Sequence, residues 1–438
     1  MSASLLDLVP AARRAVTPAR RGRVRSVVGL SFEVTGVEAA VGDAVVVHAG
    51  AGPLVGEVVA LTPTGTICMP FGDLRGVRTG DQVEPLDAPL QVHVGEALLG
   101  RVLDGLGRPL DDGPSLAGLP TVGVDGTPPH PLRRAMVREP LQLGVRAVDA
   151  LIPCGKGQRL GIFAGSGVGK SSLLSMIVRG TEADVSVLAL IGERGREVRE
   201  FIENDLGPEG LARSVVIVAT SDTPPLVRLQ SAFVATRIAE WFRDQGRDVV
   251  LMMDSLTRYA MAQREIGLSA GEAPATRGYP PSVFALLPRL LERAGAGEKG
   301  SITGLYTVLV EADDLNDPIG DAARSILDGH IALSRNLANA GHFPSIDVLS
   351  SVSRVANALL SPEQLALSAE VRSLLAAHRD ARDLVDIGAY VPGSNALVDR
   401  ALHLKGDIDG FLRQPIHETT TRESAWNHLS TVLRGAPA

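Results

Sequence analysis

The stretch GIFAGSGVGKSSLL, residues 161–174, joins a short apolar strand to a leucine-rich helix through a loop of small residues. The run that enters it, residues 159–163, is strand-like, and apolar residues recur after it at helical spacing. A strand, a glycine-rich loop, Gly-Lys-Ser and a helix, in this order, are what a phosphate-binding loop requires. The backbone N–H groups of such a loop close around phosphate oxygens at a helix N-terminus, whose dipole favours an anion. The sequence therefore predicts a nucleotide site here.

The predicted loop begins with alanine where glycine is usual, a departure that some ring-forming ATPases share. Lys170 is expected to reach the β- and γ-phosphates of ATP, and Ser171 to supply a hydroxyl ligand to Mg²⁺. ATP and Mg²⁺ are therefore the expected cofactors. The residues expected to contact the nucleotide are Ala164, Gly165, Ser166, Gly167, Val168, Gly169, Lys170, Ser171 and Ser172.

The composition is that of an ordinary soluble globular protein, with 438 residues of which 45% are hydrophobic and 21% charged. Such a length allows two or three domains. Aromatic residues make up only 3% and the net charge is −7, which argues against a nucleic-acid partner. The two cysteines, Cys68 and Cys154, lack metal-ligand spacing, and so few thiols favour a reduced, cytoplasmic protein.

The N-terminal segment, residues 1–21, differs from the rest of the chain in its charge. The first 25 residues hold six arginines and one acid. No apolar run approaches the roughly 18 residues that span a bilayer, and the basic residues follow the short apolar piece, which is the wrong order for a signal peptide. The segment fits either a solvated basic arm or a docking segment for an acidic lipid or a partner protein.

Three regions follow this segment. Residues 22–95 contain short valine-rich strands between glycine turns, which predict a small closed barrel. Residues 96–355 alternate apolar strands with helical stretches, which predict a parallel sheet covered on both faces. Residues 356–438 are expected to be helical, because Ser361 opens a capping box with proline next to it. The expected strands include 24–34, 43–48, 54–61 and 91–94 in the barrel, and 185–191, 215–219, 249–253 and 303–309 in the sheet.

Two acidic residues stand directly after apolar strands. Asp254 ends the strand in VVLMMDS (249–255), and Glu193 follows the strand in LALIGERGREVREF (188–201). Because ligands bind at the carboxyl ends of parallel strands, we expect both side chains beside Lys170. Asp254 would then anchor Mg²⁺, and Glu193 would activate an attacking water. The alternatives are that Asp254 caps a helix, and that Glu193 belongs to the surface charge cluster that follows it.

Several longer motifs resemble the rotary-ATPase family, and most closely the protein-export ATPases of flagellar and type III secretion systems. The resemblance extends from about residue 22 to about residue 400 and is most specific over residues 160–355. It implies an α/β fold with a RecA-like parallel-sheet P-loop ATPase core, an N-terminal small β-barrel and a C-terminal helical domain. The motifs are GERGRE (192–197), MDSLTRYAMAQRE (253–265), GYPPSVFALLPRLLERAG (278–295), DDLNDPIGDAARSILDGHIALSR (313–335) and SSVSR (350–354).

The resemblance also implies roles for individual residues. It implies that Lys170 contacts the phosphates, Glu193 activates the attacking water and Asp254 anchors Mg²⁺. These are the roles already predicted from the positions of these residues after strands. Arg194 and Arg258 fall on positions that support the catalytic site in the family. These assignments describe a Mg²⁺-dependent ATPase.

Two further residues take their expected roles from the family alone. Arg354, in SSVSR, falls on the arginine finger, which in the family enters the site of the neighbouring subunit. Phe343, in GHFPSID (341–347), falls on an aromatic position that packs against adenine. Relatives often have tyrosine there, so stacking is kept and a hydroxyl is lost. From the sequence alone Phe343 is equally a core residue before a proline.

A chain that carries both Glu193 and Arg354 supplies every site of a ring of identical subunits, so we expect a homohexamer. The non-catalytic subunits of rotary motors resemble the family but lack the glutamate. One rival interpretation is a hexameric RNA translocase, which would need aromatic or basic residues to hold bases, whereas the barrel region offers only Phe32 and Phe71. The other is a rotary ion-pump subunit, whose acidic stalk-contact run the C-terminal region lacks.

The amino-acid sequence of residues 382–402 favours a flagellar export ATPase over a virulence-type one. The resemblance implies that ATP hydrolysis energises protein export, by releasing and unfolding chaperone-bound substrates at the export gate. It implies a stator-like regulatory protein at the N-terminus, and a central coiled-coil stalk protein at the irregular loop 267–282. Further expected partners are export-gate membrane proteins, chaperone–substrate complexes and an anionic membrane surface. The expected location is cytoplasmic and peripheral at the inner membrane.

Overall fold

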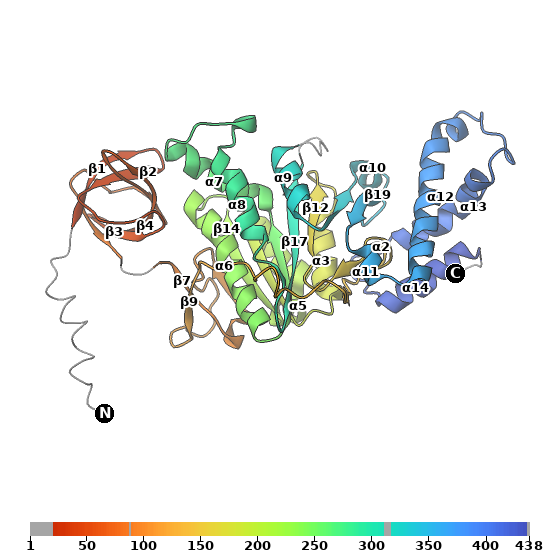
Figure 1. Ribbon diagram of the computed structural model, residues 1–438, viewed down its shortest axis with the longest axis horizontal. Coiled ribbons are helices and arrows are strands. Elements are labelled where there is room, and N and C mark those ends of the chain that lie inside the picture. Colours follow the sequence, from red (N-terminus) through yellow and green to blue (C-terminus); the bar gives the residue numbers. More distant parts are fainter. Residues whose placement is uncertain (1–20, 87–88, 311–316, 436–438) are drawn as a thin grey trace, which may run out of the picture.

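The computed structural model describes residues 21–86, 89–310 and 317–435. Within these residues the chain forms a closed six-stranded barrel, a nine-stranded sheet with helices on both faces, and a C-terminal group of helices (Figure 1). The predicted α/β class and its three parts are confirmed. The limits of these parts as domains stay predictions, and the docking segment lies outside the described residues except for Arg21.

The barrel is closed by antiparallel strand pairs in the order β1-β2-β5-β4-β3-β6. Apolar side chains at alternate positions, such as Val45 and Val47 on β3, fill its interior. Closure leaves no free edge for pairing with another chain. The strands are β1 (Gly22–Val28), β2 (Ser31–Thr35), β3 (Ala44–Ala49), β4 (Gly52–Thr62), β5 (Gly65–Pro70) and β6 (Gln82–Pro85).

Two expectations for this region are wrong in detail. The run 24–34 is not one strand, because Gly29 takes a φ of 57° and turns the chain between β1 and β2. The run 91–94 contributes β7 (Gln91–His93), which pairs with β9 (Thr121–Gly123) outside the barrel. The barrel has no place for β7, because β6 already pairs with both β1 and β3.

The central sheet has the strand order β19-β18-β12-β17-β15-β13-β14-β8, with β16 beside β17. Neighbours along this order are parallel except β18 and β19, and the pair of β16 with β17 is also antiparallel. All four sheet strands expected from apolar runs are present. The strands are β8 (Val102–Asp104), β12 (Arg159–Ala164), β13 (Val185–Glu193), β14 (Ser214–Thr220), β15 (Asp248–Asp254), β16 (Gly295–Ala296), β17 (Ser301–Leu309), β18 (Gly329–Leu333) and β19 (Ile346–Ser353).

The sheet is buried on both faces. Along β13, Val187 and Ala189 belong to one buried cluster, and Leu188 and Leu190 belong to another. The first cluster packs with α6 to α9, and the second with α2, α3 and the C-terminal helices. The helices up to residue 360 are α2 (Arg146–Leu151), α3 (Lys170–Gly180), α4 (Gly195–Glu200), α5 (Gly207–Ala212), α6 (Pro225–Asp244), α7 (Leu256–Ser269), α8 (Pro281–Leu291), α9 (Pro318–Ile326), α10 (Arg335–Asn339) and α11 (Ala356–Leu359).

Shorter elements connect these layers. Phe201–Leu206 forms a π-helix between α4 and α5. The two-residue strands β10 (Pro140–Leu141) and β11 (Cys154–Gly155) pair with each other before β12 begins. Single 3₁₀ turns lie at Glu96–Leu98 and Thr276–Gly278.

The C-terminal part consists of α12 (Pro362–Asp386), α13 (Ala396–Leu412) and α14 (Arg422–Leu433). The predicted capping box is present: the Ser361 hydroxyl accepts from the Gln364 N–H at 3.2 Å, and the Gln364 side chain accepts from the Ser361 N–H at 3.1 Å. These helices pack against the same side of the sheet as α3, so the segment after α13 approaches the phosphate-binding loop.

The irregular loop expected at 267–282 is shorter in the structure. The α7 helix runs through Ser269 and α8 begins at Pro281, so both ends of the expected loop are helical. Gly267 lies inside α7, where a Cβ atom would come within 2.9 Å of the Pro280 ring and of the Glu272 carboxylate. This glycine therefore reflects close packing and not a turn.

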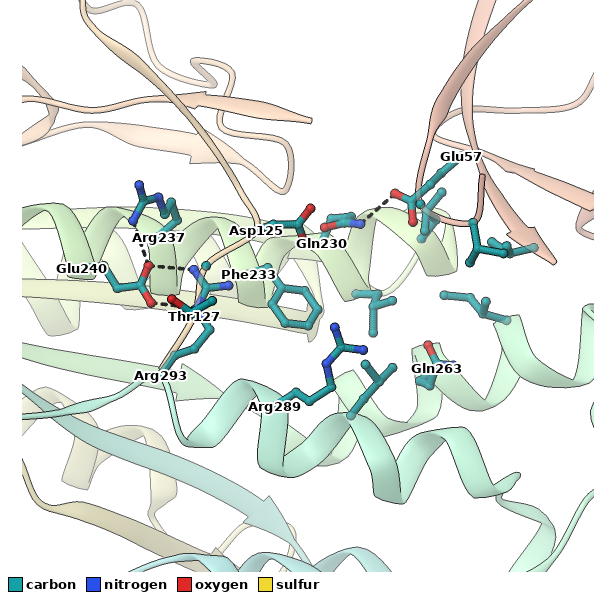
Figure 2. Close-up of a pocket in the computed structure, with 18 of the residues that line it drawn as sticks. Glu57, Asp125, Thr127, Gln230, Phe233, Arg237, Glu240, Gln263, Arg289 and Arg293 are labelled. Atoms are coloured by element: carbon teal, nitrogen blue, oxygen red, sulfur yellow. Dashed lines mark hydrogen bonds and ion pairs between the residues drawn. The ribbon is translucent and has the colours of Figure 1, made fainter. Parts of the chain in front are cut away.

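A groove of about 940 Å³ lies where the barrel meets α6, α7 and α8 (Figure 2). Gln230 on α6 donates a hydrogen bond of 2.8 Å to the carboxylate of Glu57 on β4, across this groove. Burial is the main cause that raises the pKa of Glu57 to about 7; the hydrogen bond from Gln230 opposes this rise, and the charge of Asp125 contributes to it. The contact between barrel and core thus includes a carboxyl group that titrates near neutral pH.

Candidate active site

The phosphate-binding loop leaves the sheet at the end of β12, between β17 and β18. Ala164, its first residue, is fully buried, and Lys170 begins α3. Gly167 and Gly169 have φ angles of 75° and 91°, in the left-handed region that favours glycine. The loop therefore delivers its backbone to the N-terminus of α3, an arrangement that binds anionic phosphate groups.

Two side chains outside the loop hold its backbone. The Ser345 hydroxyl, just before β19, donates to the Val168 carbonyl oxygen at 2.6 Å. Arg335, at the start of α10, donates to the Ser166 carbonyl oxygen at 3.2 Å. Neither residue is predicted from the sequence, because they lie 177 and 169 positions from their partners and belong to no phosphate-binding motif.

Three predicted side chains meet at one edge of the sheet. Asp254 ends β15 and Glu193 ends β13, and these strands are neighbours. Lys170, which follows β12, donates a hydrogen bond to Asp254 Oδ1 and lies 3.5 Å from Glu193 Oε1. The carboxyl ends of parallel strands thus bring together the residues that the sequence placed after separate apolar runs.

Asp254 is fixed by a further residue that the sequence analysis did not identify. The Thr307 hydroxyl on β17 donates to Asp254 Oδ1 at 2.7 Å. The N-cap of α7 is Ser255, whose hydroxyl accepts from the Arg258 N–H at 3.2 Å. Asp254 is therefore free of the capping role that was its alternative, and its carboxylate faces Lys170 instead.

The Glu193 side chain is largely buried, with 17% of its surface exposed. Burial raises its pKa above the ordinary value, Lys170 opposes this shift, and Asp254 and Glu197 reinforce it. Glu193 does not join the ion pairs of the following surface cluster. The pairs in that cluster are Arg194 with Glu197, Arg196 with Glu197 and Glu200, and Arg199 with Glu203.

The donor atoms at this edge suit Mg²⁺, which prefers hard oxygen ligands and is usually held by one or two protein groups plus substrate phosphates. Ser171 is exposed in the first turn of α3, next to Lys170. Both side-chain contacts of Asp254 named above go to Oδ1. Within the described residues no group of three His, Cys, Asp or Glu side chains forms a metal cage.

The two arginines expected to support the site lie at its margin. The Arg194 side chain is exposed and pairs with Glu197 at 3.1 Å. Arg258, on α7, packs its aliphatic part against Gly192, where a Cβ atom would come within 3.0 Å of it. Arg258 therefore fixes the turn that carries Glu193, whereas Arg194 points to its own helix α4.

Phe343 lies beside the loop and is 45% exposed. A Cβ atom on Gly169 would come within 3.3 Å of its ring. Next to it is a mainly apolar cavity of about 500 Å³, and the Gln414 N–H donates to the Phe343 carbonyl oxygen at 3.0 Å. The structure thus places Phe343 at a cavity of suitable size for a base and not in the core. The lining residues are Gly169, Ser172, Met176, Gly341, Phe343, Pro344, Arg413, Gln414, Pro415 and Ile416.

Arg354 does not join the other residues. Because β19 runs antiparallel to β18, Ile346 lies at the loop edge of the sheet while Ser353 pairs with Gly329 at the opposite edge. β12 has six residues, so at about 3.3 Å per residue the two edges are about 17 Å apart. Arg354 follows Ser353, is exposed, and donates to the Arg324 carbonyl oxygen at 3.1 Å. It is thus remote from the loop of its own chain.

Known proteins share these features. Residues 144–353 match the model of the ATP synthase alpha/beta family nucleotide-binding domain, and residues 360–431 match that of the T3SS EscN ATPase C-terminal domain. The flagellum-specific ATP synthase of Bacillus subtilis is 50% identical over 416 residues, covering 94% of this chain and 95% of the relative. The type 3 secretion system ATPase of Xanthomonas euvesicatoria is 49% identical over 419 residues, covering 95% of each.

A solved structure is similar over nearly the whole chain. It is the assembled ATPase EscN in complex with its central stalk EscO, from the type III secretion system of enteropathogenic E. coli. The TM-score is 0.87 at 44% identity, covering 94% of this chain and 100% of that one. The chain therefore belongs to the ATP synthase alpha/beta family, and within it to the ATPases of flagellar and type III secretion systems.

Proposed function

We propose that this protein hydrolyses ATP to energise protein export through a flagellar type III secretion apparatus, where it releases and unfolds chaperone-bound substrates at the export gate. The observation that carries this proposal is the meeting of Lys170, Glu193 and Asp254 at the edge where the phosphate-binding loop leaves the sheet. Relatives named for flagellar and for type 3 secretion ATPases support the export role.

The chemistry assigned to the site follows from its groups. The loop N–H groups and Lys170 bind the phosphates, and Glu193 orients and deprotonates the attacking water. Ser171 and Asp254 would hold Mg²⁺, which would supply positive charge to neutralise the phosphates. Phe343 packs against adenine in the cavity next to Gly169. Arg258 supports the turn before Glu193, and Arg194 takes its role from the family position alone.

We further propose that the working form is a homohexamer in which Arg354 enters the site of the neighbouring subunit. Phosphoryl transfer needs a positive charge at the γ-phosphate in the transition state. Arg354 is exposed at the edge of the sheet opposite to its own loop, so it is available to a neighbour and not to its own site. The assembled state of the relative EscN supports this arrangement.

The proposed partners come from the same family. A central stalk protein would contact the loop 270–280 between α7 and α8, as the complex of EscN with EscO suggests. We propose that residues 1–21 bind a stator-like regulatory protein and an anionic membrane surface, so that the enzyme works in the cytoplasm at the inner membrane. Export-gate proteins and chaperone–substrate complexes complete the set. No helix in the described part of the chain has the length and apolarity to cross a bilayer.

Two alternatives differ in their support. A virulence-type export ATPase is the better supported alternative, because relatives of both types have similar sequence identity to this chain. Only the amino-acid sequence of residues 382–402 favours the flagellar type. A hexameric RNA translocase is not favoured. Phe32 is 1% exposed inside the barrel and Phe71 is partly buried, so neither offers a free ring for base stacking.

Export in cells tests the proposal. The gene would be expressed in a bacterium that lacks its own flagellar export ATPase, and separately in one that lacks its virulence-type ATPase. Restored secretion of flagellar proteins in the first strain alone is the expected result, and Glu193→Gln should abolish it. Restored secretion only in the second strain would assign the protein to virulence export. ATPase activity stimulated by RNA would overturn the export role.

A further inference from the structure

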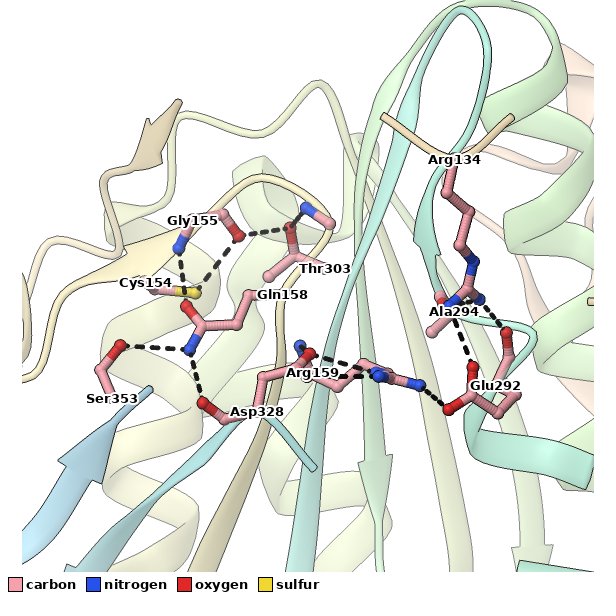
Figure 3. A network of polar contacts seen from close by, with 11 residues as sticks. Arg134, Cys154, Gly155, Gln158, Arg159, Glu292, Ala294, Thr303, Asp328 and Ser353 are labelled. Atoms are coloured by element: carbon pink, nitrogen blue, oxygen red, sulfur yellow. Dashed lines mark hydrogen bonds and ion pairs between the residues drawn. The ribbon is translucent and has the colours of Figure 1, made fainter. Parts of the chain in front are cut away.

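A network of buried polar contacts joins the start of β12 to the end of β19 (Figure 3). Its centre is Gln158, which is fully buried and precedes β12 by one residue. Its Nε2 donates to the Asp328 carbonyl oxygen and to the Ser353 hydroxyl, both at 3.2 Å. Its Oε1 accepts from the Gly155 N–H at 2.9 Å. The amide thus has a partner for each of its two N–H groups and for its oxygen.

The two groups that accept hydrogen bonds from Gln158, the Ser353 hydroxyl and the Asp328 carbonyl oxygen, are both close to the backbone of Arg354. Ser353 is the preceding residue, and its hydroxyl also donates to the Pro153 carbonyl oxygen at 2.7 Å. The Asp328 carbonyl oxygen accepts from the Arg354 N–H at 2.9 Å. The side chain of Ser353 and the backbone N–H of Arg354 are therefore both held by groups that the buried Gln158 amide contacts.

Asp328 is itself anchored to β12. Its carboxylate accepts from the backbone N–H of Arg159 at 3.0 Å and from the Arg159 guanidinium at 3.1 and 3.2 Å. The same guanidinium pairs with Glu292 at 2.5 Å, and Arg134 donates to Glu292 at 2.9 Å. The turn between α9 and β18, which holds the Arg354 N–H through the Asp328 carbonyl oxygen, is thus tied to the strand that carries the phosphate-binding loop at its far end.

We infer that Gln158 is a positioning residue for Arg354, and so acts on the catalytic site of the neighbouring subunit and not on its own. The inference rests on the proposed function, in which Arg354 serves a neighbour. Among the described residues, the Arg354 guanidinium makes one hydrogen bond, to the Arg324 carbonyl oxygen, so the direction of its side chain depends on where its backbone is held. A misplacement of about 1 Å is enough to cost about 10²-fold in rate.

The test begins with two variants and a matched control. Gln158→Met keeps the size of the side chain and removes its three hydrogen bonds, and Ser353→Ala removes one acceptor of Gln158 and is the milder change. The control is Thr303→Val, which removes two other buried hydrogen bonds of the same turn, one from the Gly157 N–H at 2.9 Å and one to the Gly155 carbonyl oxygen at 3.5 Å, without touching Ser353 or Asp328. We expect turnover to fall by about 10- to 100-fold in Gln158→Met and less in Ser353→Ala. ATP affinity and Tm should stay close to those of Thr303→Val.

Mixed rings then show on which site Gln158 acts. Gln158→Met subunits mixed with Glu193→Gln subunits should regain activity, because some interfaces combine an intact site with a well-placed finger. Gln158→Met subunits mixed with Arg354→Ala subunits should regain none, because neither supplies a working finger. If Gln158→Met does not fold, Ser353→Ala takes its place with the same expected pattern.

Each other outcome contradicts the inference. Rescue by Arg354→Ala would show that the finger of the Gln158→Met subunit works, and lack of rescue by Glu193→Gln would show that its own site is damaged. The pair Arg354→Ala with Glu193→Gln is measured beside them as the reference for a finger that acts between subunits. If this reference pair shows no rescue, the proposed arrangement of the ring fails and the inference fails with it. If only the Gln158→Met pairs depart from expectation, the ring arrangement stands and Gln158 alone is reassigned.

Discussion

The Thr307 hydroxyl donates a hydrogen bond of 2.7 Å to Oδ1 of Asp254, the same oxygen that accepts from Lys170. Thr307 lies on β17, between the strand that ends in Asp254 and the strand that leads to Lys170. The threonine therefore holds the carboxylate through Oδ1, and under the proposed function Oδ2 would be the oxygen that binds Mg²⁺.

Removing this hydroxyl should weaken catalysis without emptying the site. Thr307→Val keeps the shape of the side chain, and we expect turnover to fall by about 10- to 100-fold, since a hydrogen bond to a charged group is worth about 1.5–3 kcal/mol. The Mg²⁺ concentration for half-maximal rate should rise as well. Steady-state ATPase assays over a range of Mg²⁺ would measure both. Thr303→Val on the same strand is the control, and an equal loss there would assign the effect to packing.

Glu193 and Lys170 should fail in different ways when changed. Glu193→Gln removes the proposed base, so ATP should still bind while turnover falls by about 10²-fold or more. Lys170→Ala removes a phosphate contact, so ATP binding itself should weaken. Equilibrium binding of a fluorescent ATP analogue, measured beside the hydrolysis rate, separates the two. Near-normal turnover in Glu193→Gln would remove Glu193 from its proposed role.

The position of Arg354 predicts that activity depends on assembly. Because Arg354 is proposed to serve the site of a neighbour, specific activity should rise with protein concentration until rings are complete. Light scattering and ATPase rate measured over the same dilution series should change together. Arg354→Ala should form rings that bind ATP but turn over slowly. Constant specific activity in dilute monomer would contradict the arrangement.

Glu57 predicts a pH dependence of stability. Its pKa is raised from 4.5 to about 7 in the folded protein, so the fold binds this proton more tightly than the unfolded chain does. The free energy of unfolding should therefore fall as the pH rises from about 4.5 to about 7. Glu57→Gln should flatten this change and raise stability at pH 8 by on the order of 2 kcal/mol, because one pKa unit corresponds to about 1.4 kcal/mol.

Urea unfolding at the two ends of this range would measure the effect of Glu57. The exposed Glu209→Gln variant is the control and should follow the wild-type protein at both ends. A Glu57→Gln protein with the pH dependence of the wild type would show that the carboxyl group titrates normally.

The N-terminal segment can be tested without disturbing the active site. Deleting residues 2–18 removes two of the six arginines in the first 25 residues and the short apolar piece before them. Basal ATPase activity should be unchanged, whereas binding to the regulatory protein and sedimentation with anionic vesicles should be lost. Pull-down and vesicle assays would decide. Full binding of both targets by the truncated protein would leave the segment as a solvated basic arm.

The features that the sequence predicted correctly are local or come from a strand ending. The loop at 164–172 is encoded by a strand, small residues and a helix in succession. Glu193 and Asp254 could be brought together because parallel strands share one carboxyl edge, whatever their exact order. The features it missed depend on contacts between distant segments. Thr307, Ser345 and Gln414 meet the site only through strand order and helix packing, and no motif marks them.

Strand pairing explains the errors in the barrel region. Gln91–His93 has the alternation of a strand, and it is one, but its partner is Thr121–Gly123. The barrel does not include this segment because β6 already pairs with both β1 and β3 and so closes the barrel. Such competition between segments is invisible when each run is judged by its own residues.

The reversal of β19 gives each subunit a polarity. Under the proposed function, a subunit that offers its finger at one edge and its phosphate loop at the other would form head-to-tail contacts, in which the two surfaces are different. Two such subunits complete one site and leave one finger and one loop idle, and any open chain of subunits has the same two idle ends. Only a closed ring uses every finger and every loop. Because all its contacts are head-to-tail, the step from finger to loop runs in one direction around the ring, clockwise from one face and anticlockwise from the other. A signal passed from site to site would therefore have a direction around the circle, set by a single antiparallel strand.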